Sequence, residues 1–92
     1  MKVRVFGPLS WAMGGTQETD VHIAGSCTAR EVLKRLVVTY PSLGEKVFRE
    51  GQELQRGMNL YVGDRSIRFL NGLSTSLEEG DELTLLPILG GG

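Results

Sequence analysis

The chain has 92 residues, of which 40% are hydrophobic and 23% are charged, a composition typical of one ordinary globular domain. Ten basic and eleven acidic residues give a formal net charge of -1, which disfavours non-specific binding to nucleic acid or to an anionic membrane. No apolar run reaches the roughly 20 residues that span a bilayer, and the sequence does not open on the apolar block of a signal peptide. Because a single cysteine excludes an internal disulfide, we expect a cytoplasmic protein.

The first 23 residues predict two strands. Hydrophobic residues alternate with charged residues over positions 1–5, which is the pattern of a strand with one buried and one wet face. The alternation returns over residues 19–23, after a loop that contains Trp11. The two segments together predict a hairpin with an unusually long loop.

A helix should follow this hairpin. Thr28 and Glu31 have the spacing of a capping box, in which each side chain binds a free backbone N–H at the start of a helix. An apolar stripe over residues 32–40 predicts an amphipathic helix that ends near its last residue, because a proline comes next. A further turn or two of helix is expected within residues 43–48, and residues 51–57 are typical of a loop.

The second half of the sequence favours strands. Residues 58–62 alternate, and residues 67–69 and 73–77 are predicted to form short extended pieces. Residues 81–86 read as a final strand, and their many leucines favour a central place in a sheet covered on more than one side. The order of elements predicts an α+β domain over residues 1–86, with a mixed sheet packed on one main helix.

A short tail should leave this domain. Pro87 lacks a backbone donor, so we expect sheet pairing to stop before it and a flexible, extended tail to occupy residues 87–92. Gly90, Gly91 and Gly92 lack Cβ atoms, so they can thread a channel too narrow for other residues. On the residues alone, the Gly92 carboxylate is either a reactive group or part of an ordinary frayed terminus.

The run from Gly72 to Pro87, together with the closing Gly91-Gly92 pair, resembles the MoaD/ThiS family of sulfur carriers, which have the ubiquitin-like β-grasp fold. The resemblance implies that an E1-like enzyme of the MoeB/ThiF type adenylates Gly92 and converts it to a thiocarboxylate that donates sulfur, with Gly91 as its companion. Because the chain has neither a P-loop nor a GxGxxG run, ATP and magnesium would belong to the activating enzyme. We therefore expect a carrier that is not an enzyme and that binds no cofactor or metal.

A partner-binding patch is expected beside the tail. Phe6 continues the first strand on the wet face, the one occupied by Lys2 and Arg4, so it should lie outside the core. The resemblance implies that this phenylalanine contacts the partner enzyme, while the alternative is that Phe6 folds back onto its own sheet edge. Apolar residues of the tail would extend the patch, because monomers rarely expose large contiguous apolar areas. The expected patch consists of Phe6, Leu86, Pro87, Ile88, Leu89 and Gly90.

Four other features have two interpretations each. His22 has no second histidine or nearby cysteine in sequence, so a residue of the sheet is favoured over a metal ligand. Cys27 precedes the helix, which could lower its pKa, or it is a small buried residue. The acidic residues within 78–82 form either a solvated turn or a docking patch near the tail. Trp11 is either a lid over the core or an exposed anchor.

The C-terminal glycines are compatible with several functions. The first is a MoaD-like small subunit of molybdopterin synthase, which would carry the Gly92 thiocarboxylate into the large subunit during molybdenum cofactor biosynthesis. The alternative is a CysO-like sulfur donor in cysteine biosynthesis, because the sequence of residues 59–62 and 67–73 resembles that of such carriers. In a third, Gly92 forms isopeptide bonds with lysines, as in a ubiquitin-like protein modifier. A thiamin carrier, which is usually shorter, and an inert binding domain complete the set.

Overall fold

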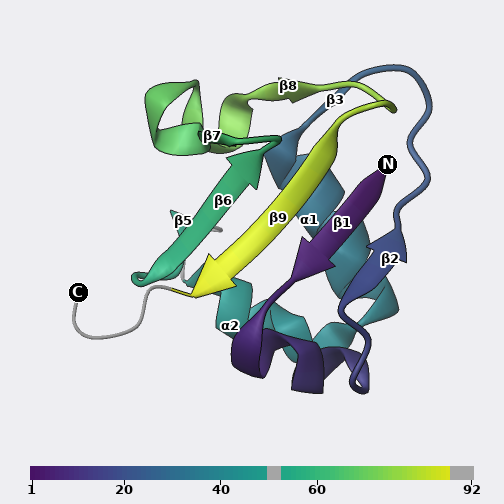
Figure 1. Ribbon diagram of the computed structural model, residues 1–92, viewed down its shortest axis with the longest axis vertical. Coiled ribbons are helices and arrows are strands. Elements are labelled where there is room, and N and C mark those ends of the chain that lie inside the picture. Colours follow the sequence, from purple (N-terminus) through teal and green to yellow (C-terminus); the bar gives the residue numbers. More distant parts are fainter. Residues whose placement is uncertain (50–52, 88–92) are drawn as a thin grey trace.

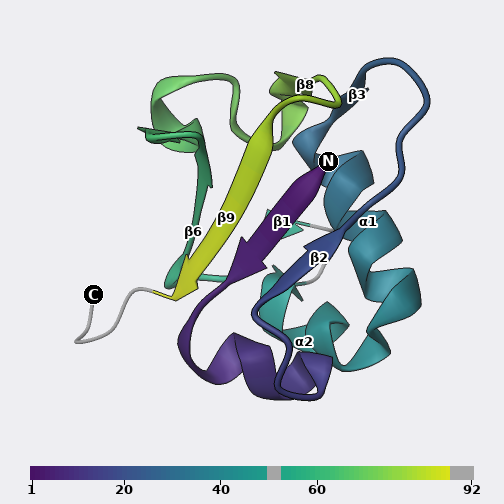
Figure 2. The same cartoon turned by 45° about the vertical axis from the view of Figure 1, so that its right-hand side comes forward.

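The computed structural model describes residues 1–49 and 53–87, which form a mixed sheet with one main helix packed across it (Figures 1 and 2). The central sheet has five strands in the order β2-β1-β9-β6-β7. They are β1 (Lys2–Val5), β2 (Glu18–Asp20), β6 (Met58–Val62), β7 (Arg65–Ser66) and β9 (Glu82–Pro87). Strands β1 and β9 run parallel at the centre, and the other neighbours are antiparallel. The predicted α+β architecture is therefore confirmed.

The main helix α1 (Ala29–Thr39) begins at the predicted capping box. The Thr28 hydroxyl accepts the Glu31 backbone N–H at 3.3 Å, and the Glu31 carboxylate accepts the Thr28 N–H at 3.2 Å. The helix ends at Thr39, with Tyr40 as its C-cap, which is close to the predicted end, because the proline that follows disfavours helical geometry at Tyr40. A short 3-10 helix (Pro41–Leu43) and helix α2 (Gly44–Val47) follow, so the predicted extra turn is present.

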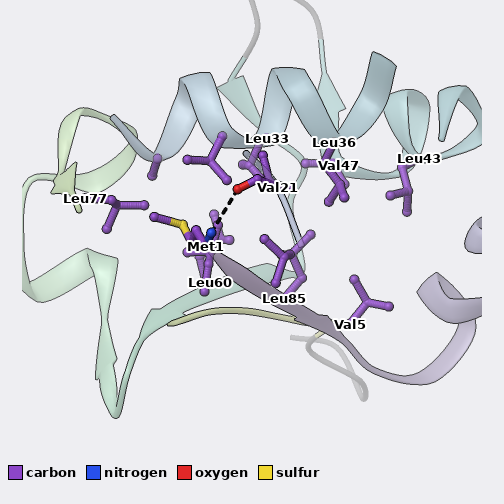
Figure 3. Close-up of a cluster of buried hydrophobic side chains, with 14 of the residues drawn as sticks. Met1, Val5, Val21, Leu33, Leu36, Leu43, Val47, Leu60, Leu77 and Leu85 are labelled. Atoms are coloured by element: carbon purple, nitrogen blue, oxygen red, sulfur yellow. Dashed lines mark hydrogen bonds between the residues drawn. The ribbon is translucent and has the colours of Figure 1, made fainter. Parts of the chain in front are cut away.

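The hydrophobic core lies between α1 and one face of the sheet (Figure 3). Leu33 and Leu36 of α1 point toward the sheet, whose Leu60 and Leu85 point back toward the helix. Because side chains alternate along a strand and recur every three or four residues along a helix, these patterns bury one face of each element. The largest fully buried side chains are those of Val3, Val5, Ile23, Val32, Leu33, Leu36, Leu43, Val47, Leu60, Leu77, Leu83 and Leu85.

The predicted second strand is shorter than expected. It ends at Asp20 instead of residue 23, because Lys2, the partner of Asp20, is the first residue of β1. The N–H of Val21 still donates to the Met1 carbonyl at 2.8 Å, and Val21 and Ile23 remain buried. Alternating burial therefore extends beyond the paired residues, so the sequence pattern overstates the length of this strand.

The first predicted extended piece is instead a 3-10 helix, Ile67–Phe69, and the second overlaps another 3-10 helix, Gly72–Ser74, and is extended at its end alone. The Ser66 hydroxyl accepts the Arg68 N–H at 3.3 Å, and the Thr75 hydroxyl donates to the Gly72 carbonyl at 2.7 Å. Such local bonds between side chain and backbone favour tight turns over extended chain, and hydrophobic alternation does not reveal them. Only β8 (Ser76–Leu77) is extended here, and it pairs with β3 (Cys27–Thr28).

Two predicted loops contain regular structure. Strand β5 (Glu53–Leu54) lies within the predicted loop 51–57 and pairs with β4 (Phe48–Arg49). The loop of the first hairpin contains a 3-10 helix, Gly7–Met13, whose Leu9 and Met13 are buried. Apolar residues at helical spacing in that loop are therefore part of the core.

Candidate functional site

The face of the sheet that α1 leaves uncovered is the candidate partner surface, and we call it the open face. Pairing aligns Arg4 with Thr84 and Thr84 with Tyr61 across three strands. A second row places Leu86 opposite Asn59. Because these residues alternate with buried ones, their side chains lie on the side away from the helix. The open face consists of Lys2, Arg4, Phe6, Glu18, Asn59, Tyr61, Glu82, Thr84 and Leu86.

The predicted patch residues within the described chain lie at the end of β9. Phe6 is 45% exposed, so its predicted place outside the core is confirmed. Its N–H donates to the Leu85 carbonyl at 3.2 Å, which brings Phe6 level with Leu86. The Pro87 ring lies 3.5 Å from the position that a Cβ atom would take at Gly7. Phe6, Leu86 and Pro87 therefore lie at the same end of β9, with Phe6 and Leu86 on the open face and Pro87 on the other side of the strand.

Sheet pairing ends one residue later than predicted. Pro87 is the last residue of β9 and lies opposite Met58, although we expected pairing to stop before it. Proline can occupy the end of a strand because no ladder hydrogen bond from its nitrogen is needed there. The other predicted site residues, Ile88, Leu89, Gly90, Gly91 and Gly92, lie outside the described residues.

The final strand is central, as predicted, but helix α1 covers only one of its faces. Leu83 and Leu85 are buried, whereas Thr84 and Leu86 are half-buried on the open face. The prediction that more than one side is covered is therefore wrong. Runs of leucine signal a central strand, but they do not show how many faces are covered.

Charged residues occupy the open face near the start of β9. Arg4 lies 3.1 Å from the Glu82 carboxylate and 3.7 Å from that of Glu18, and Lys2 lies 3.3 Å from Glu18. These side chains are 41 to 46% exposed, so water screens the pairs and each contributes little to stability. The open face thus changes from charged at the start of β9 to apolar at its end.

The acidic turn does not lie near the tail. Residues 78–82 include the turn before β9, and Pro87 stands at the opposite end of that strand (Figure 1). The Glu78 N–H donates to the Asp81 carboxylate at 2.7 Å, and Glu82 pairs with Arg4. These two carboxylates bind groups of the turn and of the sheet itself, and they lie far from Pro87, so the docking patch near the tail is not supported.

The structure also places Cys27, His22 and Trp11. Burial and the nearby Glu31 carboxylate raise the pKa of Cys27, which speaks against the interpretation that the helix N-terminus lowers it. His22 is exposed, and its carbonyl accepts a hydrogen bond from Arg35. Among residues 1–49 and 53–87, no three histidine, cysteine or acidic side chains gather as metal ligands would. Trp11 is 78% exposed, which excludes a lid over the core.

One exposed aromatic residue was missed at the sequence level. Phe69 is 86% exposed, more than any other large hydrophobic residue in the described chain. In a 3-10 helix, residues three apart share a side, so buried Ile67 and half-buried Leu70 leave Phe69 facing outward. A strand interpretation would have buried Phe69 on the side of Ile67, and for that reason the residue drew no attention.

Comparison with known proteins gives consistent results. Residues 3–92 match the model of the ThiS family. The sulfur carrier protein CysO of Mycobacterium tuberculosis is 34% identical over 71 residues, covering 75% of this chain and 76% of the relative. The crystal structure of small archaeal modifier protein 1 from Haloferax volcanii is 28% identical, with a TM-score of 0.86 and coverage of 100% of this chain and 98% of that chain. A chain in the Amycolatopsis orientalis BexX/CysO complex is 28% identical, with a TM-score of 0.85 and coverage of 99% and 98%.

These likenesses confirm the predicted ubiquitin-like β-grasp fold. They extend over nearly the whole length of both chains, so they concern the entire sheet and helix and not a single motif. No helix in the part of the chain that the structure describes has the length and apolar character needed to cross a bilayer.

Proposed function

The chain belongs to the ThiS family of sulfur carriers and ubiquitin-like proteins, and we propose that it delivers sulfur from a Gly92 thiocarboxylate to an acceptor enzyme of cysteine biosynthesis. Family membership confirms the expected resemblance and the expectation of a carrier that is not an enzyme. The CysO relatives support this acceptor. The likeness to a chain of the BexX/CysO complex supports the more general point that a carrier of this kind binds a partner protein.

The proposed chemistry takes place on the Gly92 carboxylate. A carboxylate is a poor acyl donor, so an E1-like partner first joins it to AMP from ATP and releases pyrophosphate. Sulfide then attacks the acyl carbon, AMP leaves, and one carboxylate oxygen is replaced by sulfur. ATP and magnesium ions are supplied by the partner, and this chain contributes the acyl group and the surface that the partner recognises.

The geometry at the end of β9 is the observation that supports this proposal. A strand paired on both sides holds Pro87 in place, and the next residues continue toward Gly92. Phe6 and Leu86 flank this point as exposed and half-exposed apolar groups. A partner that binds them covers the start of the tail, so that Ile88, Leu89, Gly90 and Gly91 would lead into its active site.

Protein modification is the second candidate function. The likeness to small archaeal modifier protein 1 covers all of this chain and favours it specifically. In that case the activated Gly92 acyl group passes to a lysine amine and forms an isopeptide bond. The molybdopterin synthase subunit, which was our first expectation, stays a prediction, because the likeness is to CysO carriers and archaeal modifier proteins.

The test is intact-mass spectrometry of the full chain after incubation with a cognate E1-like enzyme, ATP, magnesium ions and sulfide. Replacement of oxygen by sulfur adds about 16 Da, and we expect this gain for the wild type. Deletion of Gly92 should abolish the gain and leave thermal unfolding unchanged, because the core is formed by residues of the sheet and helix. An unchanged wild-type mass with an active enzyme would contradict the carrier chemistry.

The acceptor is identified in a second step. The thiocarboxylate form is mixed with a CysO-dependent cysteine synthase and, separately, with a molybdopterin synthase large subunit. Sulfur transfer to the cysteine synthase alone supports the proposed role in cysteine biosynthesis. Sulfur transfer to the molybdopterin synthase subunit alone would contradict it and favour the role in molybdenum cofactor biosynthesis. Higher-mass conjugates on lysines without sulfur transfer would identify a modifier.

A further inference from the structure

Two asparagines, Asn59 and Asn71, lie in contrasting surroundings. Asn59 belongs to β6 and is half-buried, whereas Asn71 is exposed on the segment that joins β7 to β8. Figure 1 shows this segment at the opposite end of the sheet from Pro87, so Asn71 lies apart from the point where β9 ends. The two asparagines also differ in their hydrogen bonds and in the residue that follows each.

The side chain of Asn59 is held by three hydrogen bonds. Its Oδ1 accepts the Leu60 N–H at 3.1 Å and the Ser66 hydroxyl at 3.2 Å, and its Nδ2 donates to the Tyr61 hydroxyl at 3.4 Å. The residue that follows, Leu60, is fully buried. Both the Asn59 amide and the backbone nitrogen next to it are therefore fixed in place.

The side chain of Asn71 has no such restraint in the described chain. Asn71 precedes the 3-10 helix Gly72–Ser74, but its side chain does not cap that helix, although asparagine is a common cap. Its only hydrogen bonds to residues 1–49 and 53–87 are made by its backbone. The next residue, Gly72, has a φ of 56° and no Cβ atom to shield its nitrogen. A free side-chain amide therefore lies next to an unshielded backbone nitrogen.

We infer that Asn71 is a site of spontaneous deamidation, at which the chain modifies itself without a partner. The Gly72 backbone nitrogen loses its proton to water and attacks Cγ of the Asn71 side chain. The bond from Cγ to the amide nitrogen breaks, and this nitrogen takes a proton from water and leaves as ammonia. Water then opens the resulting succinimide ring at either carbonyl, which gives aspartate or isoaspartate. The exchange of ammonia for water adds about 1 Da and a negative charge.

The folded turn controls how fast this reaction proceeds. The Asn71 N–H donates to the Thr75 hydroxyl at 3.0 Å, and the Ser74 N–H donates to the Asn71 carbonyl at 3.0 Å. Ring closure requires rotation of the backbone between Asn71 and Gly72, which disturbs these two hydrogen bonds. Deamidation therefore takes place when the turn opens locally, and it does not require the whole domain to unfold.

The isoaspartate product weakens the connection between this turn and α1. In isoaspartate the main chain runs through the former side chain, so the carbonyl that accepts from Ser74 leaves the main chain. Thr75 is buried, and its carbonyl accepts the N–H of Ala29, the first residue of α1, at 2.9 Å. A distorted turn displaces this acceptor. We therefore expect the isoaspartate form to unfold at a lower temperature than the unmodified chain.

The test is incubation of the purified full chain in mildly alkaline buffer, followed by trypsin digestion and mass spectrometry. Cleavage after Arg65 and Arg68 places the two asparagines in different peptides. The peptide with Asn71 should gain about 1 Da. Asn59 is the internal control and should react at least roughly tenfold more slowly, because its side chain must first release its hydrogen bonds. The rate at Asn71 should rise with pH, because the Gly72 nitrogen must lose a proton.

The matched variant is Asn71→Gln. It keeps the amide but would have to close a larger, disfavoured ring, so the mass gain should disappear. Because the Asn71 side chain caps nothing, this variant should unfold at the wild-type temperature. A gain that persists at the wild-type rate in Asn71→Gln would overturn the inference, because another residue would then be reacting. So would the absence of a gain at Asn71, or equal rates at the two asparagines, and both of these results need only the wild-type chain.

A final measurement tests the effect on the turn. The isoaspartate form is separated by chromatography, identified with a protein isoaspartyl methyltransferase, and unfolded thermally beside the unmodified chain. An unchanged unfolding temperature would overturn the weakened connection to α1. None of these measurements uses an activating or acceptor enzyme, so their outcome is independent of the proposed sulfur transfer.

Discussion

The two faces of strand β9 have different tasks. Leu83 and Leu85 are buried and pack toward α1, whereas Thr84 and Leu86 lie on the open face at the level of Arg4 and Phe6. Because successive side chains of a strand point to opposite sides, a single step along β9 separates a core position from a surface position. Substitutions on the two faces should therefore separate the stability of the fold from recognition by a partner.

The largest stability effect is expected on the buried face. Leu85→Ala removes a fully buried side chain and should lower the free energy of unfolding by about 2–5 kcal/mol, because it leaves a cavity in the core. Urea unfolding followed by circular dichroism measures the change. Leu86→Ala, one residue further on, is the matched control and should cost less than about 1.5 kcal/mol. Equal losses at both positions would show that the open face is packed as tightly as the core.

The open face should show the opposite pattern. Phe6→Ala should weaken binding to the partner enzyme by about 1–3 kcal/mol, because a half-exposed aromatic side chain at the end of β9 acts as an anchor. Isothermal titration calorimetry with the activating enzyme measures the affinity. The free energy of unfolding should change by less than about 1 kcal/mol. If affinity is unchanged while stability falls, Phe6 belongs to the fold and not to the interface.

The smallest effect is expected among the charged residues of the same face. Arg4→Gln breaks the contacts with Glu18 and Glu82 and should cost no more than about 1 kcal/mol, since all three side chains are exposed to water. The difference from the wild type should shrink in high salt, which thermal unfolding at two ionic strengths tests. A cost above about 2 kcal/mol that salt does not reduce would mean that these charges hold the sheet together.

Part of the fold can be predicted from local sequence patterns. The alternation at Val3 and Val5 and the capping box at Thr28 and Glu31 are local patterns with one strong physical interpretation, and both predict what the structure shows. The end of β2 depends instead on where its partner strand begins, which no residue within β2 records. Strand lengths at the edge of a sheet are therefore hard to predict from a single segment.

The candidate site was predictable where it follows strand parity. Phe6 is exposed because it continues the parity of Arg4, and this follows from alternation alone. Phe69 was not found, because Ser66 and Thr75 form side-chain hydrogen bonds that turn the chain into 3-10 helices. In an extended chain, Phe69 would lie on the same side as buried Ile67. The wrong local geometry therefore predicts burial for the most exposed aromatic side chain of the described residues.

The central position of β9 has a consequence for how the molecule folds. Strand β9 joins β1 to β6, so without it the central sheet separates into two strand pairs, β2-β1 and β6-β7. Pairing of β9 with β1 closes a loop of about 80 residues, a long-range contact that forms slowly and cooperatively. The strand that leads to the tail is thus the strand that completes the sheet. A partner that requires the assembled open face therefore acts only on chains that have finished folding.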